Sequence, residues 1–241
     1  MCGRFVLEQS SEDLRALFEI DEYVTELPVP NWNIPPQTQI AVVIEAKNRE
    51  PSAAQSSATR SSATHRRLEQ AKWGLVPLWA KDEKIGARAI NARSETVTSK
   101  PMFREAFAKR RALIPADGYY EWQKHADGKT PFFIHGSELL AFAGLYEWWR
   151  RADGSWLLST TILTDAAHGK MRAIHDRIPL ILPREHWNEW IDPNAPGNDA
   201  LLENARSATA AFSDELQLHE VDPAVGNVRN NSPHLIEPLR P

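Results

Sequence analysis

The apolar residues of this chain come in short runs that are rich in β-branched side chains and end near glycine, proline or aspartate. Such runs are typical of strands, whereas a 3.6-residue spacing of apolar residues is typical of helices. The predicted strands cover residues 39–45, 111–114, 131–134, 140–145 and 156–164. The predicted helices cover residues 102–109, 184–191 and 199–205, and a short helix follows the N-cap signal at Ser10 or Ser11. The sequence therefore predicts an α+β fold with a mainly antiparallel sheet.

Residues 47–67 interrupt this pattern because they are rich in Ser, Ala and Thr and contain no aromatic or branched aliphatic residue. Such a segment cannot bury enough apolar surface to offset its ordering entropy, so we expect a disordered loop. Strand-like sequence on both sides favours an expanded hairpin loop over a domain boundary. Because 241 residues fit one domain, we expect residues 1–241 to form a single domain.

The apolar runs are also too short for a membrane protein. The longest, such as residues 40–44 and 178–182, fall well below the roughly 20 residues that cross a bilayer. The N-terminus moves from Met-Cys-Gly-Arg-Phe into polar residues without the apolar segment of a secretory signal. We therefore expect a cytoplasmic protein with no membrane partner.

Charge is distributed unevenly along the chain, although the formal net charge is only −4. Residues 81–111 contain nine Lys or Arg and four Asp or Glu, which gives a net charge of +5. Residues 185–223 contain nine acids and one basic residue, Arg206, which gives −8. Uneven charge of this kind allows one face to attract phosphate despite the negative total.

Cys2 is the only cysteine, which excludes an intramolecular disulfide and a zinc site built from several cysteines. We expect removal of Met1, because the residue that follows is small, and this leaves Cys2 with an α-amine beside its thiol. With reference pKa values of about 7.7–8.0 and 8.5, both groups are partly deprotonated at neutral pH. An aldehyde would condense with the amine to an imine, and the thiol would close on the imine carbon to a thiazolidine. The alternative is that Cys2 is an incidental second residue.

Five motifs decide between these alternatives. They are MCGRF at residues 1–5, WGLVPLWAK at 73–81, INARSET at 90–96, PADGYYEW at 115–122 and HDRIPLIL at 175–182. Together, and in this order, they resemble the SOS-response-associated peptidase (SRAP) family over nearly the whole chain. The resemblance implies a barrel-like sheet core with peripheral helices. It also implies an abasic-site processing protein that crosslinks covalently to single-stranded DNA and shields the lesion during the DNA damage response.

The resemblance also assigns catalytic roles. Cys2 would be the nucleophile and Asn91 would orient it, while Glu121 and His175 would transfer protons. A carboxyl and an imidazole suit the opening of the deoxyribose ring and the loss of water in imine formation. The other possibilities are a solvated acid for Glu121 and a hydrogen-bonded core histidine for His175. The resemblance requires no metal or cofactor, and a lyase side reaction by β-elimination would compete with thiol closure.

Further residues are candidates for DNA contact. The guanidinium groups of Arg93 and Arg177, and that of Arg4, would hold phosphates, unless they pair with acids such as Glu95 or Asp176. Trp73, Trp122 and Phe103 would stack on unstacked bases or act as a wedge. Thr164 completes the predicted DNA-binding set.

The chain departs from the family pattern in three places. Ile178 replaces a common Met, Ala112 replaces a frequent second Cys, and the loop at residues 47–67 is longer than expected. The first change nearly conserves volume, and the second leaves Cys2 as the only thiol nucleophile. We therefore expect the chemistry to be unchanged.

Two other functions remain open. A self-processing cysteine peptidase would use Cys2, His175 and Glu121 as nucleophile, base and orienting group, and it would not need the α-amine. A non-covalent single-stranded DNA binding module would not need Cys2 at all. A monomer is the simplest expectation, with single-stranded DNA containing abasic sites as partner. If the protein is bacterial, we expect it to associate with the nucleoid during DNA damage.

Overall fold

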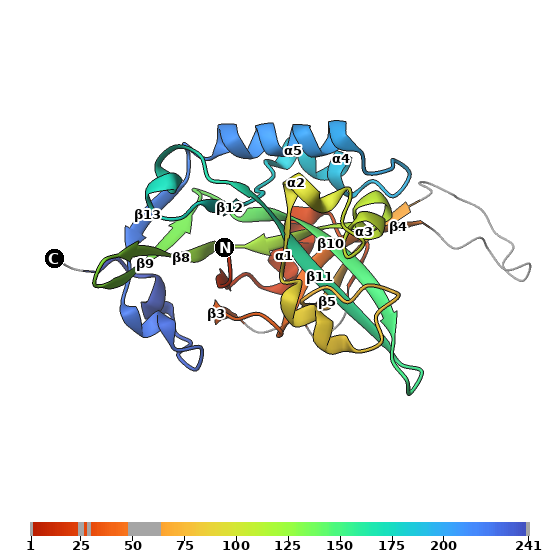
Figure 1. Ribbon diagram of the computed structural model, residues 1–241, viewed down its shortest axis with the longest axis horizontal. Helices are drawn as coiled ribbons and strands as arrows, with labels where there is room; N and C mark the ends of the chain where they lie inside the picture. The colour runs from red at the N-terminus through yellow and green to blue at the C-terminus, as the bar shows by residue number, and fades with distance from the viewer. Residues whose placement is uncertain (1, 24–26, 28–29, 48–63, 240–241) are drawn as a thin grey trace, which may run out of the picture.

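The computed structural model describes residues 2–23, 27, 30–47 and 64–239 (Figure 1). Its core is a closed barrel of five strands, in which β4, β5, β7, β10 and β11 pair in the order β11–β10–β7–β4–β5. The neighbours in this order are antiparallel, and a parallel pairing of Ser159 with Lys72 and Thr160 with Trp73 joins β11 to β5. The predicted α+β fold with a mainly antiparallel, barrel-like core is confirmed. The strands are β4 (Gln39–Lys47), β5 (Thr64–Trp73), β7 (Arg111–Ala116), β10 (Leu140–Arg150) and β11 (Trp156–Ala166).

A second antiparallel sheet brings the N-terminus to the middle of the molecule. Its order is β13–β9–β8–β1–β3, so that β1 lies between two other strands. Phe5 in β1 pairs with Tyr119 in β8, which places Cys2 near Glu121. The strands are β1 (Phe5–Leu7), β3 (Asn31–Ile34), β8 (Gly118–His125), β9 (Gly128–His135) and β13 (Gln217–Glu220).

Two three-residue strands join the same end of β11. Strand β6 (Asn91–Arg93) pairs with β11 in parallel, and β12 (Arg177–Pro179) pairs with it antiparallel. Thr164 is opposite Arg93 in one pairing and opposite Pro179 in the other. One segment of β11 therefore fixes the strands next to Asn91 and His175. A short strand, β2 (Glu22–Tyr23), pairs in parallel with β5.

The helices lie outside the sheets, with α5 along the upper edge of the view in Figure 1. Ser10 caps α1 through a capping box with Asp13, as the N-cap signal predicts. The α-helices are α1 (Ser11–Phe18), α2 (Ser94–Val97), α3 (Arg104–Lys109), α4 (Trp187–Ile191) and α5 (Asp199–Phe212). The 3-10 helices are η1 (Glu83–Arg88), η2 (Gly169–Ala173), η3 (Arg184–His186), η4 (Pro223–Gly226) and η5 (Pro233–Ile236). Among the described residues, no helix combines the length and the apolar character needed to cross a membrane.

The prediction of a disordered loop over residues 47–67 is wrong at both ends of the segment. Lys47 ends β4 and is paired with Thr64 at the start of β5, so the hairpin prediction is confirmed while its loop boundaries are wrong. Polar residues extend β5 because they find partners there. Arg66 donates to Glu45 at 3.0 Å, to Asn188 at 2.8 Å and to the Phe18 carbonyl at 3.0 Å. The predicted disorder falls on residues 48–63, which lie outside the described residues.

Arg111, at the start of β7, is a buried charge that joins three parts of the chain. Its side chain donates to the carbonyls of Trp190 and Asp192 at 2.6 and 2.7 Å. It also donates to Phe107 and Ala108 at 3.1 Å and to Ala195 at 2.7 Å. These bonds use all five N–H groups of a guanidinium. Arg111 is therefore part of the core, although the charge count above includes it in the basic segment 81–111.

Candidate functional site

Cys2 is fully buried and is held by Asn91. The Asn91 side-chain amide donates to the Cys2 carbonyl at 2.7 Å. Asn91 begins β6, which the parallel pairing with β11 fixes in place. The predicted contact between a residue at the N-terminus and one in the INARSET motif thus forms, although 89 positions separate them.

The environment of the Cys2 thiol differs from that of a free cysteine. Burial, followed by the negative charge of Glu121, raises the pKa of Cys2, and a hydrogen bond from the Arg4 backbone opposes the shift. In the chain that still carries Met1, burial thus acts against the partial deprotonation that reference values predict after Met1 is removed. The thiol is therefore held in its protonated form until a base takes its proton.

Glu121 lies on β8 with only 3% of its surface exposed. Burial raises the pKa of Glu121, while the charge of nearby His175 acts against the shift. Burial, together with the charges of Cys2 and Glu121, also raises the pKa of Tyr119 well above its ordinary value. A carboxyl group in this environment changes protonation closer to neutral pH than an exposed one. Cys2, Tyr119, Glu121 and His175 therefore form one electrostatic group.

His175 has two partners on the same ring nitrogen. The Arg177 backbone N–H lies 3.0 Å from Nδ1, and a carboxylate oxygen of Asp176 lies 2.8 Å from it. An unprotonated Nδ1 accepts from Arg177, whereas a protonated Nδ1 donates to Asp176. Both contacts hold the imidazole in one orientation.

The structure corrects two of the predicted stacking residues. Trp73 is fully buried, its indole N–H donates to the Ile90 carbonyl at 2.8 Å, and its ring meets Phe5 edge-on at 5.2 Å. Phe103 is 6% exposed and belongs to the same core. Neither ring presents a face to an unstacked base, because each fills space in the hydrophobic core. These residues support the site from inside.

Trp122 is half-buried and lies beside two cations. The Arg4 guanidinium is 5.8 Å and the Lys129 ammonium 5.5 Å from the ring centroid. Arg4 also donates to the Asn33 side-chain oxygen at 2.6 Å and to the Val225 carbonyl at 2.9 Å. Arg4 is thus bonded inside the protein, while the Trp122 ring remains partly accessible.

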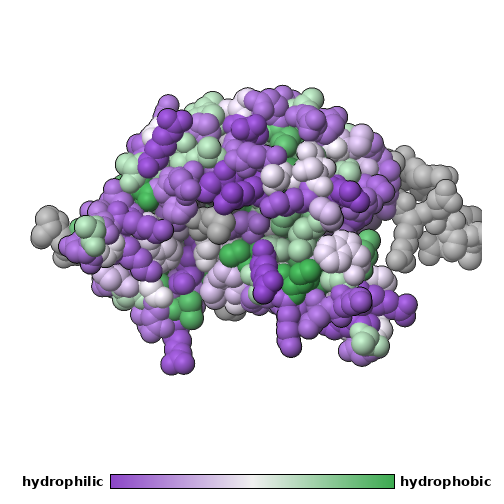
Figure 2. All heavy atoms as spheres, in the orientation of Figure 1, coloured by the Kyte–Doolittle hydropathy of each residue, from purple (hydrophilic) through white to green (hydrophobic). Residues whose placement is uncertain are grey.

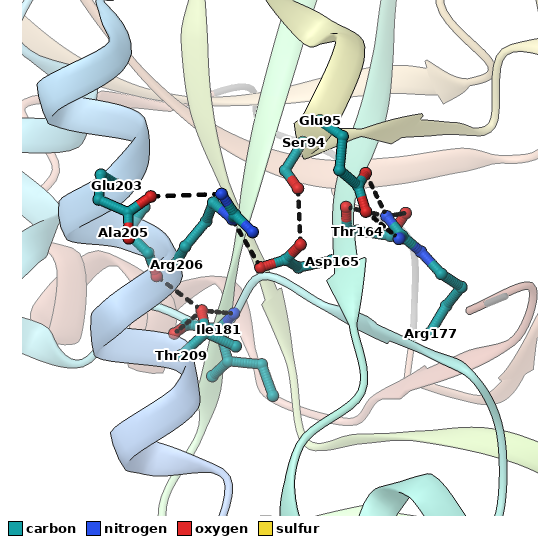
Figure 3. Close-up of polar contacts among 10 residues, drawn as sticks. All are labelled: Ser94, Glu95, Thr164, Asp165, Arg177, Ile181, Glu203, Ala205, Arg206 and Thr209. Carbon is teal, nitrogen blue, oxygen red and sulfur yellow. Dashed lines mark hydrogen bonds and ion pairs between the residues drawn. The ribbon is translucent and has the colours of Figure 1, made fainter.

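The two other arginines differ from each other. Arg93 is exposed. Arg177 pairs through both terminal nitrogens with Glu95 and donates to the Thr164 carbonyl at 2.7 Å (Figure 3). The hydrogen bonds from Arg177 lower the pKa of Glu95 to about 2. The pairing with Glu95 that the sequence left open therefore forms, and Thr164 is a buried partner of Arg177.

Sequence reasoning missed the exposure of two apolar residues and the contacts of one buried amide. Leu78 and Trp79 are 55% and 58% exposed, although they stand in the same motif as buried Trp73. Asn33 is buried and donates to the carbonyls of Val225, Asn227 and Asn230. Turn-forming Pro77 and charged Lys81, which flank the first pair, were a signal for its exposure, whereas nothing local distinguishes Asn33.

The surface around the site is mixed. Figure 2 shows hydrophobic and hydrophilic residues interspersed on the face where Figure 1 places the N-terminal end of the chain. A groove of about 830 Å³ lies elsewhere, between α1, the turn before β10 and α5, and includes Leu17, Leu139, Trp187 and Phe212. Within the described part of the chain, no three His, Cys, Asp or Glu residues gather as metal ligands would.

Comparison with solved structures supports the fold. A crystal structure of a protein from Bacteroides thetaiotaomicron aligns with a TM-score of 0.81 at 20% identity, covering 99% of this chain and all of that one. A second, from Bordetella bronchiseptica, aligns with a TM-score of 0.69 at 25% identity, covering 92% of this chain and all of that one.

Comparison with known sequences identifies the family. The chain is 38% identical to the abasic site processing protein YoqW of Bacillus subtilis, over 98% of this chain and 99% of that protein. It is 32% identical to the abasic site processing protein YedK of Escherichia coli, over 99% of this chain and all of that protein. The family model described as SOS response associated peptidase (SRAP) matches residues 1–228. The chain belongs to the SRAP family.

Proposed function

We propose that this protein captures abasic sites in single-stranded DNA through a thiazolidine formed by Cys2 after Met1 is removed. The observation that carries the proposal is the hydrogen bond from Asn91 to the Cys2 carbonyl, which fixes the backbone of the reacting residue. The relatives named abasic site processing proteins support the choice of substrate. No metal or cofactor takes part in the proposed reaction.

The reaction has two bond-forming steps. The Cys2 amine adds to C1′ of the ring-opened deoxyribose, and loss of water gives an imine. The thiol then adds to the imine carbon, and its proton passes to the nitrogen. The products are one thiazolidine and one water, without any oxidant or reductant. Because the thiol and the amine belong to the same residue, the second step is intramolecular and strongly favoured.

Glu121 and His175 would move the protons. Opening of the sugar needs a proton at the ring oxygen and a base for the C1′ hydroxyl, and the thiol must lose its proton before it attacks. Burial raises the pKa of Glu121, which suits a group that gives as well as takes a proton. The two contacts at His175 Nδ1 would hold the imidazole in place for the transfer.

DNA would reach the site along exposed side chains. Arg93 would hold a phosphate, and the partly accessible Trp122 would stack on a base. Leu78 and Trp79 replace buried Trp73 and Phe103 as candidates for apolar contact with unstacked bases. Arg4, Thr164 and Arg177 would act mainly by holding the walls of the site, because they are bonded within the protein.

Two further activities would use the same residues. A lyase reaction would follow if the imine, which acidifies the neighbouring C2′, lost the 3′ phosphate before the thiol closed. Self-processing would cleave the bond between Met1 and Cys2, and the word peptidase in the family description is the reason to consider it. Self-processing predicts that a chain with Glu121→Gln retains Met1.

The test combines protein whose loss of Met1 is confirmed by mass with an oligonucleotide that carries one abasic site. We expect an adduct that survives denaturation and whose mass is the sum of both molecules less one water. Chains that retain Met1, and an intact oligonucleotide, are the controls and should give no adduct. An equal shift of both oligonucleotides in native gels, without any adduct, would instead identify a non-covalent binding module.

Glu121→Gln is expected to slow adduct formation by at least about 100-fold, because general acid–base catalysis typically contributes that much. The measurement is the single-turnover rate on Met1-free chains at saturating DNA. Stability should not fall at neutral pH, since the amide removes a buried carboxylate whose desolvation opposes folding. A rate within a few-fold of wild type would exclude Glu121 from the chemistry.

The pH dependence of stability gives a second readout for the same variant. Burial raises the pKa of Glu121 in the folded chain, so the folded state binds this proton more tightly than the unfolded state. Relative to the variant, the wild type should therefore gain stability as the pH falls from the raised pKa toward the ordinary value of 4.5. Thermal unfolding between pH 8 and pH 4 measures the difference.

A further inference from the structure

A buried carboxylate connects three elements around the site. Asp165, near the end of β11, has a side chain that is 2% exposed. One of its oxygens accepts from the Ser94 hydroxyl at 2.8 Å, and the other accepts from Arg206 Nε at 2.9 Å (Figure 3). Ser94 starts α2 immediately after β6, and Arg206 lies on α5. Asp165 therefore holds α2 and α5 against β11.

The ion pair between Arg177 and Glu95 lies beside this carboxylate. Ser94 and Glu95 are neighbours in the chain, as are Thr164 and Asp165, and Figure 3 shows both ion pairs at the same end of β11. The charge of Arg206 contributes, after Arg177, to the low pKa of Glu95. The two pairs thus act on each other and form one network across α2, β11, β12 and α5.

Stability alone does not explain a buried carboxylate that pairs with an arginine side chain 37% exposed. Removing the carboxylate charge from water costs free energy that its attraction to the arginine only partly returns, so an apolar residue often serves stability as well or better. Hydrogen bonds that a buried carboxylate accepts do, however, restrict how the attached elements can lie. In this network the restricted elements are those that carry the site.

We propose that Asp165 is a positioning residue for the Cys2 site. This inference rests on the proposed function, because it assigns Asp165 a role in the same reaction. Through Ser94 it fixes β6, which carries Asn91, and through the neighbouring pair of Glu95 and Arg177 it fixes β12.

The connection from β6 and β12 to the reacting groups is short. Strand β6 has three residues, and Asn91 stands three positions before Ser94, so the hydroxyl bond to Asp165 adds to the backbone pairing with β11 in holding this short strand. On the other side, the backbone N–H of Arg177 bonds His175 Nδ1 at 3.0 Å. A shift of about 1 Å in such groups can reduce a rate by about 100-fold. Asp165 thus acts on both the residue that orients Cys2 and the histidine.

The test is Asp165→Asn, which keeps the size of the side chain and removes its charge. We expect the single-turnover rate at saturating abasic DNA to fall by about 10-fold, with a change of less than about 3-fold in the DNA concentration at half-saturation. Arg206→Lys, which preserves the positive charge, should lose less of the rate than Arg206→Met. Equal rates for Asp165→Asn and wild type would overturn the proposal.

Glu147→Gln provides the matched control. Glu147 is a buried carboxylate on β10, outside the network, and its side chain is 4% exposed. It accepts a hydrogen bond from the Arg110 guanidinium at 2.7 Å. The Glu147→Gln variant should change thermal stability as much as Asp165→Asn does and leave the single-turnover rate of adduct formation unaltered. An equal loss of rate in both variants would show a general effect of destabilisation and refute a positioning role.

A double-mutant cycle and hydrogen exchange complete the test. Asp165→Asn should cost much less rate in a Glu95→Gln background if it acts through the neighbouring pair, whereas additive losses would contradict this route. Amide exchange at residues 90–97 should accelerate in Asp165→Asn and not in Glu147→Gln. Because exchange does not depend on crosslinking, it tests the positioning role even if wild type forms no adduct, which would refute the proposed function alone.

Discussion

Cys2→Ala is expected to abolish the adduct with abasic DNA that survives denaturation. Alanine retains an α-amine and can still form an imine, but without a thiol the imine cannot close to a thiazolidine and hydrolyses. The measurement is denaturing electrophoresis with and without borohydride, which reduces an imine to a stable amine. We expect no band without the reductant and a weak band with it.

Non-covalent affinity gives the control for this variant. Cys2→Ala should still bind single-stranded DNA with an affinity that falls as salt rises, because phosphate contacts do not involve the thiol. Circular dichroism and thermal unfolding check that the alanine has not disrupted the buried N-terminal segment. A borohydride-independent band as strong as that of wild type would exclude the thiazolidine.

Arg111→Met is expected to reduce the free energy of unfolding by about 3–5 kcal/mol, because five carbonyls around a buried charge lose their donor. Methionine matches much of the stem but offers no hydrogen bond. Arg111→Lys should recover only part of the loss, since an ammonium has three donors and lacks the planar fork. Urea unfolding at neutral pH measures both variants.

Arg104→Met serves as the control because Arg104 is an exposed residue on α3 and should change stability by less than about 0.5 kcal/mol. If Arg111→Met cost less than about 1 kcal/mol, the carbonyls would have found other partners, and Arg111 would not be the residue that joins α3 and α4 to β7.

The sequence predicts the strands of the fold well where apolar runs are clear. Residues 39–45, 140–145 and 156–164 all lie within β4, β10 and β11. It fails at β5, whose first residues are polar and form a strand because β4 supplies backbone partners and Glu45 and Asn188 bind Arg66. Tertiary partners of this kind leave no local pattern.

The site is predicted less evenly than the fold. The motifs identify Cys2 and Asn91, and the structure brings this pair into contact. They cannot distinguish a buried tryptophan from an exposed one in the same segment, as Trp73 and Trp79 show. Nor does a count of charges show that Arg111 points inward. Burial is decided by packing between distant segments, which a linear pattern does not contain.

The position of Cys2 in the completed fold has a consequence for synthesis. His175 follows Cys2 by 173 residues, which a ribosome adding about 5–20 residues per second needs on the order of 10–30 s to make. During that interval the nascent N-terminus has no pocket to enter, and afterwards Cys2 is fully buried. An aminopeptidase that removes Met1 therefore has its best access while translation is still under way, so slow processing would leave a folded chain without the reactive amine.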